Sequence, residues 1–370
     1  MNNDALGDLI AEAALCAFSK LTCKSGKPSI RSNGVQEWTV MASVVAIMNN
    51  ETIEPLTIAT GVKVMPNRVR AFSQGFIVHD MHAEILALRL FNFFLLHECA
   101  KESSIWVEQG GSNAKYRLKP SVKLALFVTE PPCGDCSMEY LASSLESNEP
   151  WTEQAELFLN DQFHRGRNNF DRVGVVRTKP GRLDSLISYS KSCSDKLCLK
   201  QLTGICNTTT ALIFDPIYLD FLVVNGVETK NFERCFINRL SGIEPTVHHL
   251  KLLHYTKDGY EYHKAQDKEP SPVSLLYIVP SQFVQVLNNG IKNGAAAAKN
   301  QTPKAGTESI ICNRSFITVL SKLISTPSTI ASPTYLQLKR SQVNRERLKN
   351  VGKTTLQNWK PTDDDDFSII

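Results

Sequence analysis

The chain has 370 residues, of which 42% are hydrophobic, so it can bury a sizeable core and does not have the composition of a disordered protein. Its 41 basic and 37 acidic residues give a formal net charge of +4, which excludes a strongly polycationic surface. No stretch approaches the roughly 18 apolar residues needed to span a bilayer, and the first residues lack the basic region of a secretory signal. We therefore expect a soluble protein of the cytoplasm and/or nucleus, without membrane contact, in which most of the ten cysteines are reduced.

The first elements are a helix and a β-hairpin. Apolar residues at helical spacing predict an amphipathic helix over residues 4–20. Two β-rich runs follow at residues 38–48 and 56–64. The polar residues between them, 49–51, predict that the two strands form a hairpin.

The middle of the chain alternates between helices and strands. Residues 83–96 are apolar almost all round, which predicts a helix buried between two layers. Residues 122–128 predict a buried strand, and a short helix capped by Asp135 is expected to run through Leu141. Further strands are expected over residues 173–177, 211–214 and 274–279. This alternation predicts an α/β fold with a mixed central sheet covered on both faces.

The C-terminal part contains two segments of unusual composition. Residues 288–306 are rich in Ala, Asn, Gly and Lys, and are expected to form a surface excursion rather than a domain linker. Residues 335–353 predict one amphipathic, strongly basic helix. We expect the acidic run at residues 363–366 to be a solvated element of the tail.

Two short motifs carry the chemistry. His82-Ala83-Glu84 is followed, past a strand, by Pro132-Cys133-Gly134-Asp135-Cys136. Together and in this order they fit the H-x-E…P-C-x-x-C pattern of zinc-dependent deaminases. Each motif lies where a helix begins, and the macrodipole at a helix start favours a thiolate such as that of Cys133.

The expected roles follow from zinc chemistry. A catalytic zinc takes three protein ligands and keeps its fourth position for water. His82 supplies a neutral nitrogen, and Glu84, two residues later, can lie beside the metal and carry protons. The alternative is a buried histidine followed by a glutamate that caps a helix. The third ligand is ambiguous from spacing alone, since Cys136 satisfies C-x-x-C while Cys193 lies in a separate segment.

His-Ala-Glu, Pro-Cys-Gly-Asp and the segment Ser192-Cys193-Ser194-Asp195-Lys196 resemble the adenosine deaminases acting on RNA and their tRNA-specific relatives. The resemblance implies that Cys193 completes the metal site and that Cys136 is a buried neighbour. It also implies a cytidine-deaminase-like three-layer fold with a family-specific C-terminal extension. We expect one domain over residues 1–370, with a zinc-binding core at about 35–220 and the extension at about 221–370.

The resemblance extends to most of the chain, through Gly26-Lys27-Pro28, Glu37-Trp38-Thr39-Val40, Thr60-Gly61-Val62-Lys63, Asp215-Pro216-Ile217-Tyr218 and Trp359-Lys360-Pro361. The segment from Arg177 to Arg182 looks like the eukaryotic tRNA-specific branch, which deaminates the adenosine immediately 3′ of the anticodon in alanine tRNA. The chain has no room for separate double-stranded RNA-binding modules, and an anticodon loop offers unstacked bases that are cheap to extrude. The expected partner is tRNA, with no obligate protein partner.

A buried inositol hexakisphosphate is the second implication of the resemblance. The basic and aromatic positions that match the family's ligands are Arg89, Lys196, Tyr335, Lys339, Lys349 and Trp359. Leu88 and Leu199 stand where relatives usually have arginine. Lys196, three residues after a zinc-ligating cysteine, could link the metal site to the polyanion by hydrogen bonds.

Basic residues in loops are the candidates for RNA contacts. They are Lys63, His164, Arg165, Arg167, Lys179 and Arg182. Only a cluster of such residues gives the phosphate contacts that make binding dependent on salt, and basic loop residues are otherwise simply solvated.

Three other functions remain open from the sequence. The metal motifs report the attack on a ring and not which ring is attacked, so a cytidine deaminase is an alternative. An adenosine deaminase acting on other structured RNA is another. The third is a catalytically silent RNA-binding protein whose zinc is structural, with Cys136 as a fourth protein ligand.

Overall fold

The computed structural model describes residues 3–49, 52–110, 115–143, 164–166, 171–180, 185–243, 247–296, 298–324 and 332–369. Within these segments, no helix combines the length and the apolar character that crossing a membrane requires.

An eight-stranded mixed sheet forms the centre of the molecule. Its strands, in spatial order, are β12 (Lys251–Leu253), β11 (Phe221–Val223), β8 (Val122–Val128), β2 (Met41–Met48), β3 (Thr52–Thr60), β14 (Val273–Ile278), β15 (Phe283–Asn288) and β16 (Ile291–Lys292). Strands β8, β11 and β12 are parallel to one another, and the remaining neighbours are antiparallel. Strands from residues 221–292 therefore complete the sheet at both edges.

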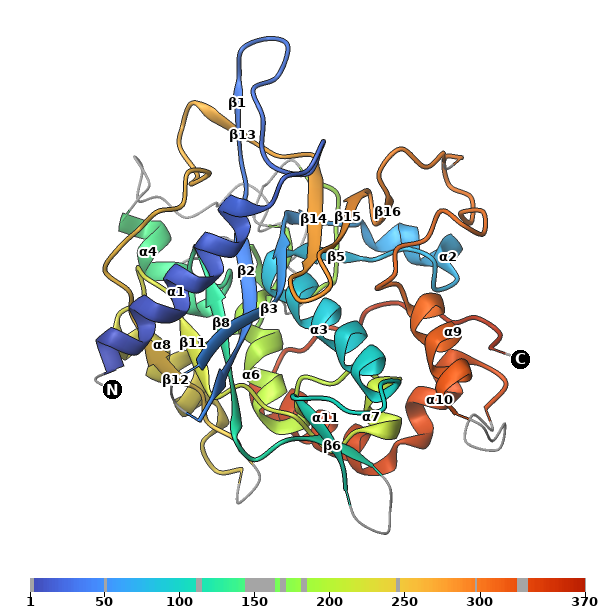
Figure 1. Ribbon diagram of the computed structural model, residues 1–370. Helices are drawn as coiled ribbons and strands as arrows, with labels where there is room; N and C mark the ends of the chain where they lie inside the picture. Colours follow the sequence, from blue (N-terminus) through green and yellow to red (C-terminus); the bar gives the residue numbers. More distant parts are fainter. Residues whose placement is uncertain are drawn as a thin grey trace.

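Two hydrophobic clusters cover the two faces of this sheet. Side chains alternate along β2, so that Met41 and Val45 point to one face while Ala42 and Val44 point to the other. Helix α1 (Asn3–Lys20) packs on the first face (Figure 1). The second face is covered by α3 (Ala83–Cys99), α6 (Cys193–Thr203) and α9 (Asn313–Leu323). These layers bear out the predicted α/β fold with a mixed sheet between helices, as in cytidine-deaminase-like proteins.

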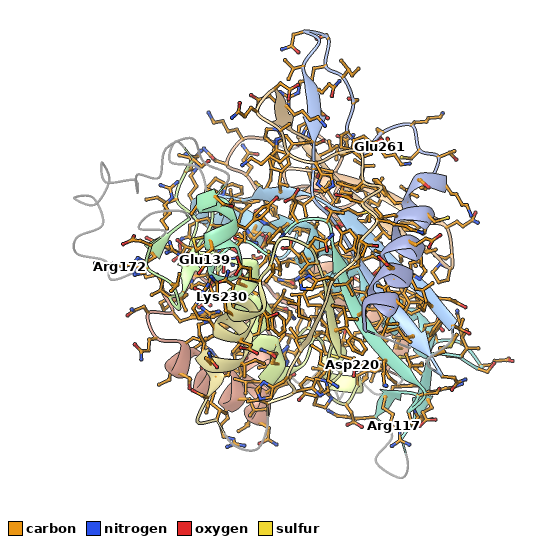
Figure 2. The ribbon with its side chains drawn as sticks, turned by 90° about the vertical axis from the view of Figure 1, so that its left-hand side faces the viewer. Arg117, Glu139, Arg172, Asp220, Lys230 and Glu261 are labelled. Carbon is orange, nitrogen blue, oxygen red and sulfur yellow. The ribbon has the colours of Figure 1, made fainter. Side chains whose placement is uncertain are left out.

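Smaller elements surround the central sheet. Four two-stranded pairs are β1 (Gln36–Trp38) with β13 (Lys268–Pro270), β4 (Val62–Val64) with β5 (Asp80–His82), β6 (Val107–Gln109) with β7 (Tyr116–Leu118), and β9 (His164–Arg165) with β10 (Arg177–Thr178). The short helices are η1 (Asn67–Val69), α2 (Arg70–Ser73), η2 (Asp135–Ser137), α4 (Met138–Ser143), α7 (Thr210–Ile213), α8 (Thr229–Phe232), η3 (Glu233–Ile237) and η4 (Asn238–Leu240). Lys230 of α8 forms an ion pair with Glu139 of α4 at 3.1 Å, and both side chains are labelled in Figure 2.

Most of the predicted elements are confirmed, with shifted ends. The predicted hairpin corresponds to β2 and β3, but residues 62–64 form the separate strand β4. Gly61 separates them: its φ is +153°, and a Cβ there would lie 2.1 Å from the carbonyl oxygen of Met81. The close approach of the Met81 backbone requires glycine at this position. At Gly61 the chain leaves the central sheet and continues into β4.

Two predicted strands and one predicted helix cap are wrong, whereas the short helix expected from Asp135 through Leu141 is confirmed as η2 and α4. The segment 211–214 lies mainly in helix α7, because the Asn207 Oδ1 accepts the Thr210 amide at 2.9 Å and starts a helical turn. Of residues 173–177, only Arg177 lies in a strand. Asp135 does not cap the helix after it, because Gly134 occupies that position and the Asp135 carboxylate is buried in an ion pair.

The predicted basic helix over residues 335–353 is two helices, α10 (Tyr335–Ser341) and α11 (Val343–Leu356). The break falls at Gln342, whose φ of −82° and ψ of 68° are not helical. Its side-chain amide donates to the carbonyl oxygen of Thr208 at 2.7 Å, which compensates for the interrupted helix.

Candidate metal centre and active site

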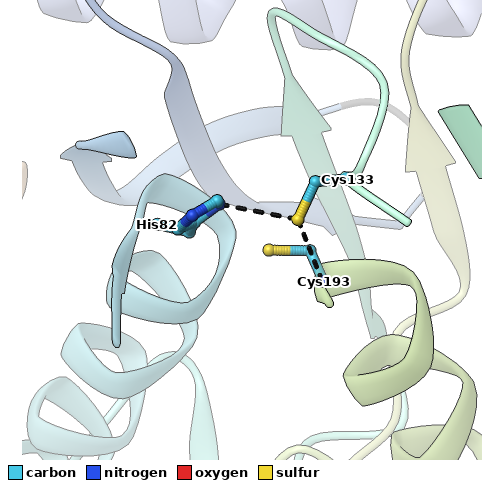
Figure 3. Close-up of side chains that lie close together, drawn as sticks. All are labelled: His82, Cys133 and Cys193. Atoms are coloured by element: carbon cyan, nitrogen blue, oxygen red, sulfur yellow. Dashed lines mark hydrogen bonds between the residues drawn. The ribbon is translucent and has the colours of Figure 1, made fainter. Parts of the chain in front are cut away.

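Three side chains from distant parts of the chain converge on one point. His82 ends strand β5, Cys133 lies in the loop after β8, and Cys193 begins helix α6. Their ligand atoms all lie within 4.8 Å of one another (Figure 3). The His82 Nδ1 is 3.6 Å from the Cys133 Sγ, which also accepts the backbone N–H of Cys193 at 3.3 Å. One imidazole nitrogen and two thiols form a donor set that fits Zn²⁺.

Two helix N-termini face this cluster. His82 is the N-cap residue of α3, and Cys193 is the first residue of α6, whose N-cap Ser192 accepts the Asp195 amide. Helix starts favour negative charge, so both helices support thiolates at this point. A hydrogen bond from Cys193 lowers the pKa of Cys133 well below its usual range, whereas burial raises the pKa of Cys193.

Glu84 lies in the first turn of α3, two residues after His82, with only 3% of its surface exposed. Burial raises the pKa of its carboxyl, and the negative charge of the nearby Cys133 adds to the shift. A buried carboxyl group whose pKa is raised above its ordinary value is suited to both accepting and releasing a proton.

A buried network of charges adjoins the group formed by His82, Cys133 and Cys193. The Lys179 Nζ donates to both carboxylate oxygens of Asp80, at 2.9 and 2.8 Å, and to the Cys193 Sγ at 3.2 Å. Lys196 also donates to Asp80 and to the Ser190 Oγ. Burial alone would raise the pKa of Asp80, but the two ammonium groups outweigh it and hold that pKa well below its usual range.

Lys179 is therefore misplaced among the expected RNA contacts. It is 2% exposed, and Asp80 raises its pKa against the effect of burial. A lysine committed to a buried carboxylate and a thiol cannot also meet a phosphate at the surface. Asp80 is a further functional residue, and its position two residues before His82 is the one sequence signal that marks it.

Cys136 lies outside the cluster. Among the described residues, the group of ligand atoms contains Cys193 and not Cys136. The Cys136 thiol is buried against Cys235, which raises its pKa well above the usual value by a hydrogen bond. Its backbone N–H donates to the Ser194 Oγ at 3.2 Å and so ties the Cys133 loop to α6.

Two buried ion pairs hold the motif segments in place. The Arg239 Nη1 lies 2.7 Å from the Asp195 Oδ1, and the Arg234 Nε lies 3.3 Å from the Asp135 Oδ2. Asp195 also accepts the backbone N–H of Arg177 at 2.9 Å. Sequence reasoning missed both arginines, because no local motif indicates which residue of a later segment meets a buried carboxylate.

A second cluster gathers positive charge from α3, α6, α10 and α11 and from the segment just before α6. Its members are Arg89, Lys191, Lys196, Lys200, Lys339, Arg345, Lys349 and Lys353. Burial is the main cause that lowers the pKa of Lys191, Lys200 and Lys349, each to about 7, and neighbouring cations lower it further. We call this group the cation cluster.

Two aromatic residues border the cation cluster. Tyr335 donates to the Asn313 Oδ1 at 3.4 Å, as Arg89 does at 3.0 Å. The Lys191 Nζ lies 5.6 Å from the centre of the Trp359 ring. Leu199, which stands where relatives usually have arginine, packs against α11. The contact is so close that a Cβ at Gly352 would lie 2.5 Å from the Leu199 Cδ1.

The other RNA candidates fall in different places. Lys63 lies half-buried on β4, next to the strand that carries His82, and burial followed by the charge of Arg31 lowers its pKa. Arg165 is 5% exposed and donates to the carbonyl oxygen of Ser185. The prediction that it contacts an RNA phosphate is therefore wrong, because its side chain is buried. Arg167 and Arg182 lie outside the described residues.

Comparisons with known proteins show the family of this chain. Residues 57–362 match the adenosine-deaminase (editase) domain family. The chain is 38% identical to the tRNA-specific adenosine deaminase 1 of Schizosaccharomyces pombe, over 100% of this chain and 98% of that protein. It is 31% identical to the protein of the same name from Saccharomyces cerevisiae, over 99% of this chain and 95% of that protein.

A more distant relative is the double-stranded RNA-specific editase B2 of Mus musculus, which is 24% identical over 87% of this chain and 46% of that protein. The family match covers the segments that carry His82, Glu84, Cys133 and Cys193. The chain therefore belongs to the adenosine-deaminase (editase) family.

Proposed function

We propose that this protein is a zinc-dependent tRNA adenosine deaminase that converts adenosine to inosine. The observation that carries the proposal is the convergence of His82, Cys133 and Cys193 beside the buried carboxyl of Glu84. Its relatives from two yeasts are named tRNA-specific adenosine deaminase 1, and each aligns with nearly the whole chain.

The reaction consumes one water and releases ammonia from C6 of the base. His82, Cys133 and Cys193 would hold zinc, and the metal would supply the Lewis acidity that lets water attack near neutral pH. Glu84 accepts one proton from the water and delivers it to the ring nitrogen. It then takes the remaining proton from the added hydroxyl group and delivers it to the departing amine. Lys179 stays buried behind Cys193 and holds its sulfur in place through their 3.2 Å contact.

We propose as the substrate position the adenosine immediately 3′ of the anticodon in alanine tRNA. Support comes from the segment between Arg177 and Arg182, which resembles the tRNA-specific branch, and from the names of the yeast relatives. Lys63 is the described residue that we propose for an RNA contact, because it lies on the strand paired with β5. Arg167 and Arg182 stay candidates for phosphate contacts.

We further propose that the cation cluster holds inositol hexakisphosphate. The cluster brings together eight basic side chains with few buried carboxylates among them, and neighbouring cations lower the pKa of Lys191, Lys200 and Lys349. Such a group forms a donor set suited to a polyanion. The expected ligands are Arg89, Lys196, Lys339 and Lys349, with Tyr335 and Trp359 at the border. Lys191, Lys200, Arg345 and Lys353 extend the set beyond the expected positions.

We propose that residues 1–370 act as one unit, without an obligate protein partner, in the cytoplasm and/or nucleus. Strands from both the expected core and the expected extension share the central sheet, which supports a single unit.

The experiment that tests the function is incubation of the purified protein with total tRNA, followed by sequencing. Inosine reads as guanosine, and the expected signal is a single new position 3′ of the alanine anticodon. A cytidine-to-uridine change instead would identify a cytidine deaminase. Zinc-loaded protein that changes no base in tRNA would overturn the proposal.

A further inference from the structure

The C-terminal tail lies against the segment that leads into the metal-binding strand. The Asp365 side chain, expected in solvent, is only 4% exposed. Its carboxylate accepts three hydrogen bonds, from the Ser73 Oγ at 3.0 Å, the Gly75 amide at 2.9 Å and the His79 Nε2 at 3.0 Å. All three donors come from one stretch of seven residues, 73–79, just before β5.

Other tail residues strengthen this contact. Asp363 accepts from the Asn67 side-chain amide, and its carbonyl oxygen accepts from the Arg70 Nη1 at 3.3 Å. The Phe367 ring lies so close to Gly75 that a Cβ at that position would approach it to 2.3 Å. The tail therefore fits the segment both in charge and in shape.

His79 connects the tail to the metal centre. Its carbonyl oxygen accepts the Met65 amide at 2.8 Å, and the next residue, Asp80, begins the β4–β5 ladder that ends at His82. The His79 Nδ1 has no hydrogen-bond partner among the described residues. Within that part of the chain, the bond to Asp365 is therefore the polar contact that orients the imidazole.

The charges favour this arrangement. Burial lowers the pKa of His79, and the neighbouring Arg70 lowers it as well, so the ring is neutral and donates its Nε2 hydrogen. Burial would raise the pKa of Asp365, but the hydrogen bonds from His79, Gly75 and Ser73 keep it below its ordinary value. An ionised carboxylate with three donors is a strong anchor.

We propose that Asp365 is a positioning residue for the metal centre: by fixing His79, it holds β5 so that His82 and Asp80 face Cys133 and Cys193. The tail thereby completes a site whose ligands lie more than 170 residues earlier in the chain. The inference rests on the proposed zinc site and adds a residue that contacts neither metal nor substrate.

The test compares Asp365→Ala and Asp365→Asn with the matched control Asp364→Asn. Asp364 is exposed and makes no hydrogen bond or ion pair within the described segments, so its variant loses the same charge one residue away. Three readouts are taken on protein that circular dichroism shows to be folded. They are the rate of zinc release to a chelator, the visible spectrum of the cobalt-substituted protein, and kcat and KM on tRNA.

We expect Asp365→Ala to release zinc about tenfold faster than wild type, with an altered cobalt spectrum, since outer partners of metal ligands have effects of this size. The kcat should fall by about tenfold while KM stays within about twofold. Asp365→Asn should be intermediate, because its carbonyl oxygen can still accept from the Gly75 amide while its amide nitrogen replaces the oxygen that accepts from Ser73 and His79. Asp364→Asn should match wild type.

Folded Asp365 variants with wild-type zinc release and cobalt spectra would overturn the inference. If Asp365→Ala does not fold, Asp365→Asn decides on the same criteria. The measurement of zinc release does not require turnover. A wild type that makes no inosine would therefore contradict the proposed function, but the positioning role of Asp365 could still be measured from zinc release. A wild type that takes up neither metal would contradict both.

Discussion

The ammonium group of Lys179 donates a hydrogen bond to the sulfur of Cys193 at 3.2 Å while it is paired with Asp80. This lysine joins a proposed metal ligand to a buried carboxylate in the interior. Removing it by Lys179→Met leaves Asp80 with Lys196 as its remaining cation. Loss of one partner from a buried ion pair lowers the free energy of unfolding by about 3–5 kcal/mol. Because Lys196 still pairs with Asp80, we expect the loss to be about 3 kcal/mol.

Urea unfolding at pH 7 measures this loss. The matched control is Lys63→Met, which removes a half-buried ammonium group that has no ion pair among the described residues. It should cost less than about 1 kcal/mol. Equal losses from the two variants would contradict the role assigned to Lys179.

Glu84→Gln keeps the size of the side chain and removes its ability to carry a proton. Inosine formation should fall by at least about 10²- to 10⁴-fold, which is the contribution of a positioned proton carrier. Zinc content, measured by plasma emission spectroscopy, should stay at the wild-type value because Glu84 is not among the converging ligands.

Glu54→Gln on strand β3 is the matched control for this experiment, since Glu54 makes no side-chain hydrogen bond or ion pair within the described segments. Its activity should equal that of wild type. An active Glu84→Gln variant would mean that another group moves the proton.

The cation cluster makes stability depend on pH when no anion is bound. Burial lowers the pKa of Lys200 and Lys349 to about 7 in the folded protein. An unfolded lysine titrates near 10.4, so between these values the unfolded state binds more protons. The stability of anion-free protein should therefore rise from pH 7 to pH 9.

Urea unfolding of wild type and Lys200→Met at pH 7, 8 and 9 checks this sign. The variant should show a smaller rise with pH, and added inositol hexakisphosphate should stabilise wild type more than the variant. The prediction fails if the polyphosphate leaves the unfolding midpoint of wild type unchanged, or if both proteins respond to pH equally.

His263 links a C-terminal loop to the residue before the metal-loop prolines. Its Nδ1 lies 2.9 Å from the Glu130 Oε1, and its Nε2 lies 2.9 Å from the Asp258 Oδ2. The hydrogen bond to Glu130 is the main cause that raises its pKa to about 9. Because the folded pKa exceeds the unfolded value of about 6.5, the stabilisation is complete below pH 6.5 and is lost as pH rises through 9.

His263→Gln should therefore destabilise the protein by about 1 kcal/mol at pH 6, a value reduced for solvent screening, and by much less at pH 10. His249→Gln is the control, since His249 is exposed and has no hydrogen bond or ion pair in the described part of the chain. A cost for His263→Gln that does not change between the two pH values would show that the charge is not involved.

Local signals predicted the parts of the molecule that depend on neighbours in sequence. The period of apolar residues located α1, α3 and β8 to within a few residues, and the spacing of His82, Glu84 and Cys133 indicated the metal site. Elements that the apolar pattern alone does not distinguish were missed. A short apolar run such as residues 211–214 fits both a strand and a buried helix, and the hydrogen bond from the Thr210 amide to the nearby Asn207 side chain starts a helical turn there.

The same limit applies to the charged residues. A basic residue in a glycine- and proline-rich segment resembles an exposed RNA contact, yet Lys179 and Arg165 are buried. The acidic run near the C-terminus has the composition of a solvated tail. The Asp365 carboxylate nevertheless accepts three hydrogen bonds from residues almost 300 positions earlier in the chain. Sequence spacing carries no information about such contacts, which depend on how the layers pack.

We propose that three protein ligands, His82, Cys133 and Cys193, hold the metal and leave one position for water. X-ray absorption at the zinc edge of the purified protein tests it most directly. We predict two sulfur neighbours at about 2.3 Å, from Cys133 and Cys193, and two lighter neighbours, one of them the nitrogen of His82. A shell of three or more sulfurs, or zinc that binds equally well to Cys193→Ala, would contradict the account.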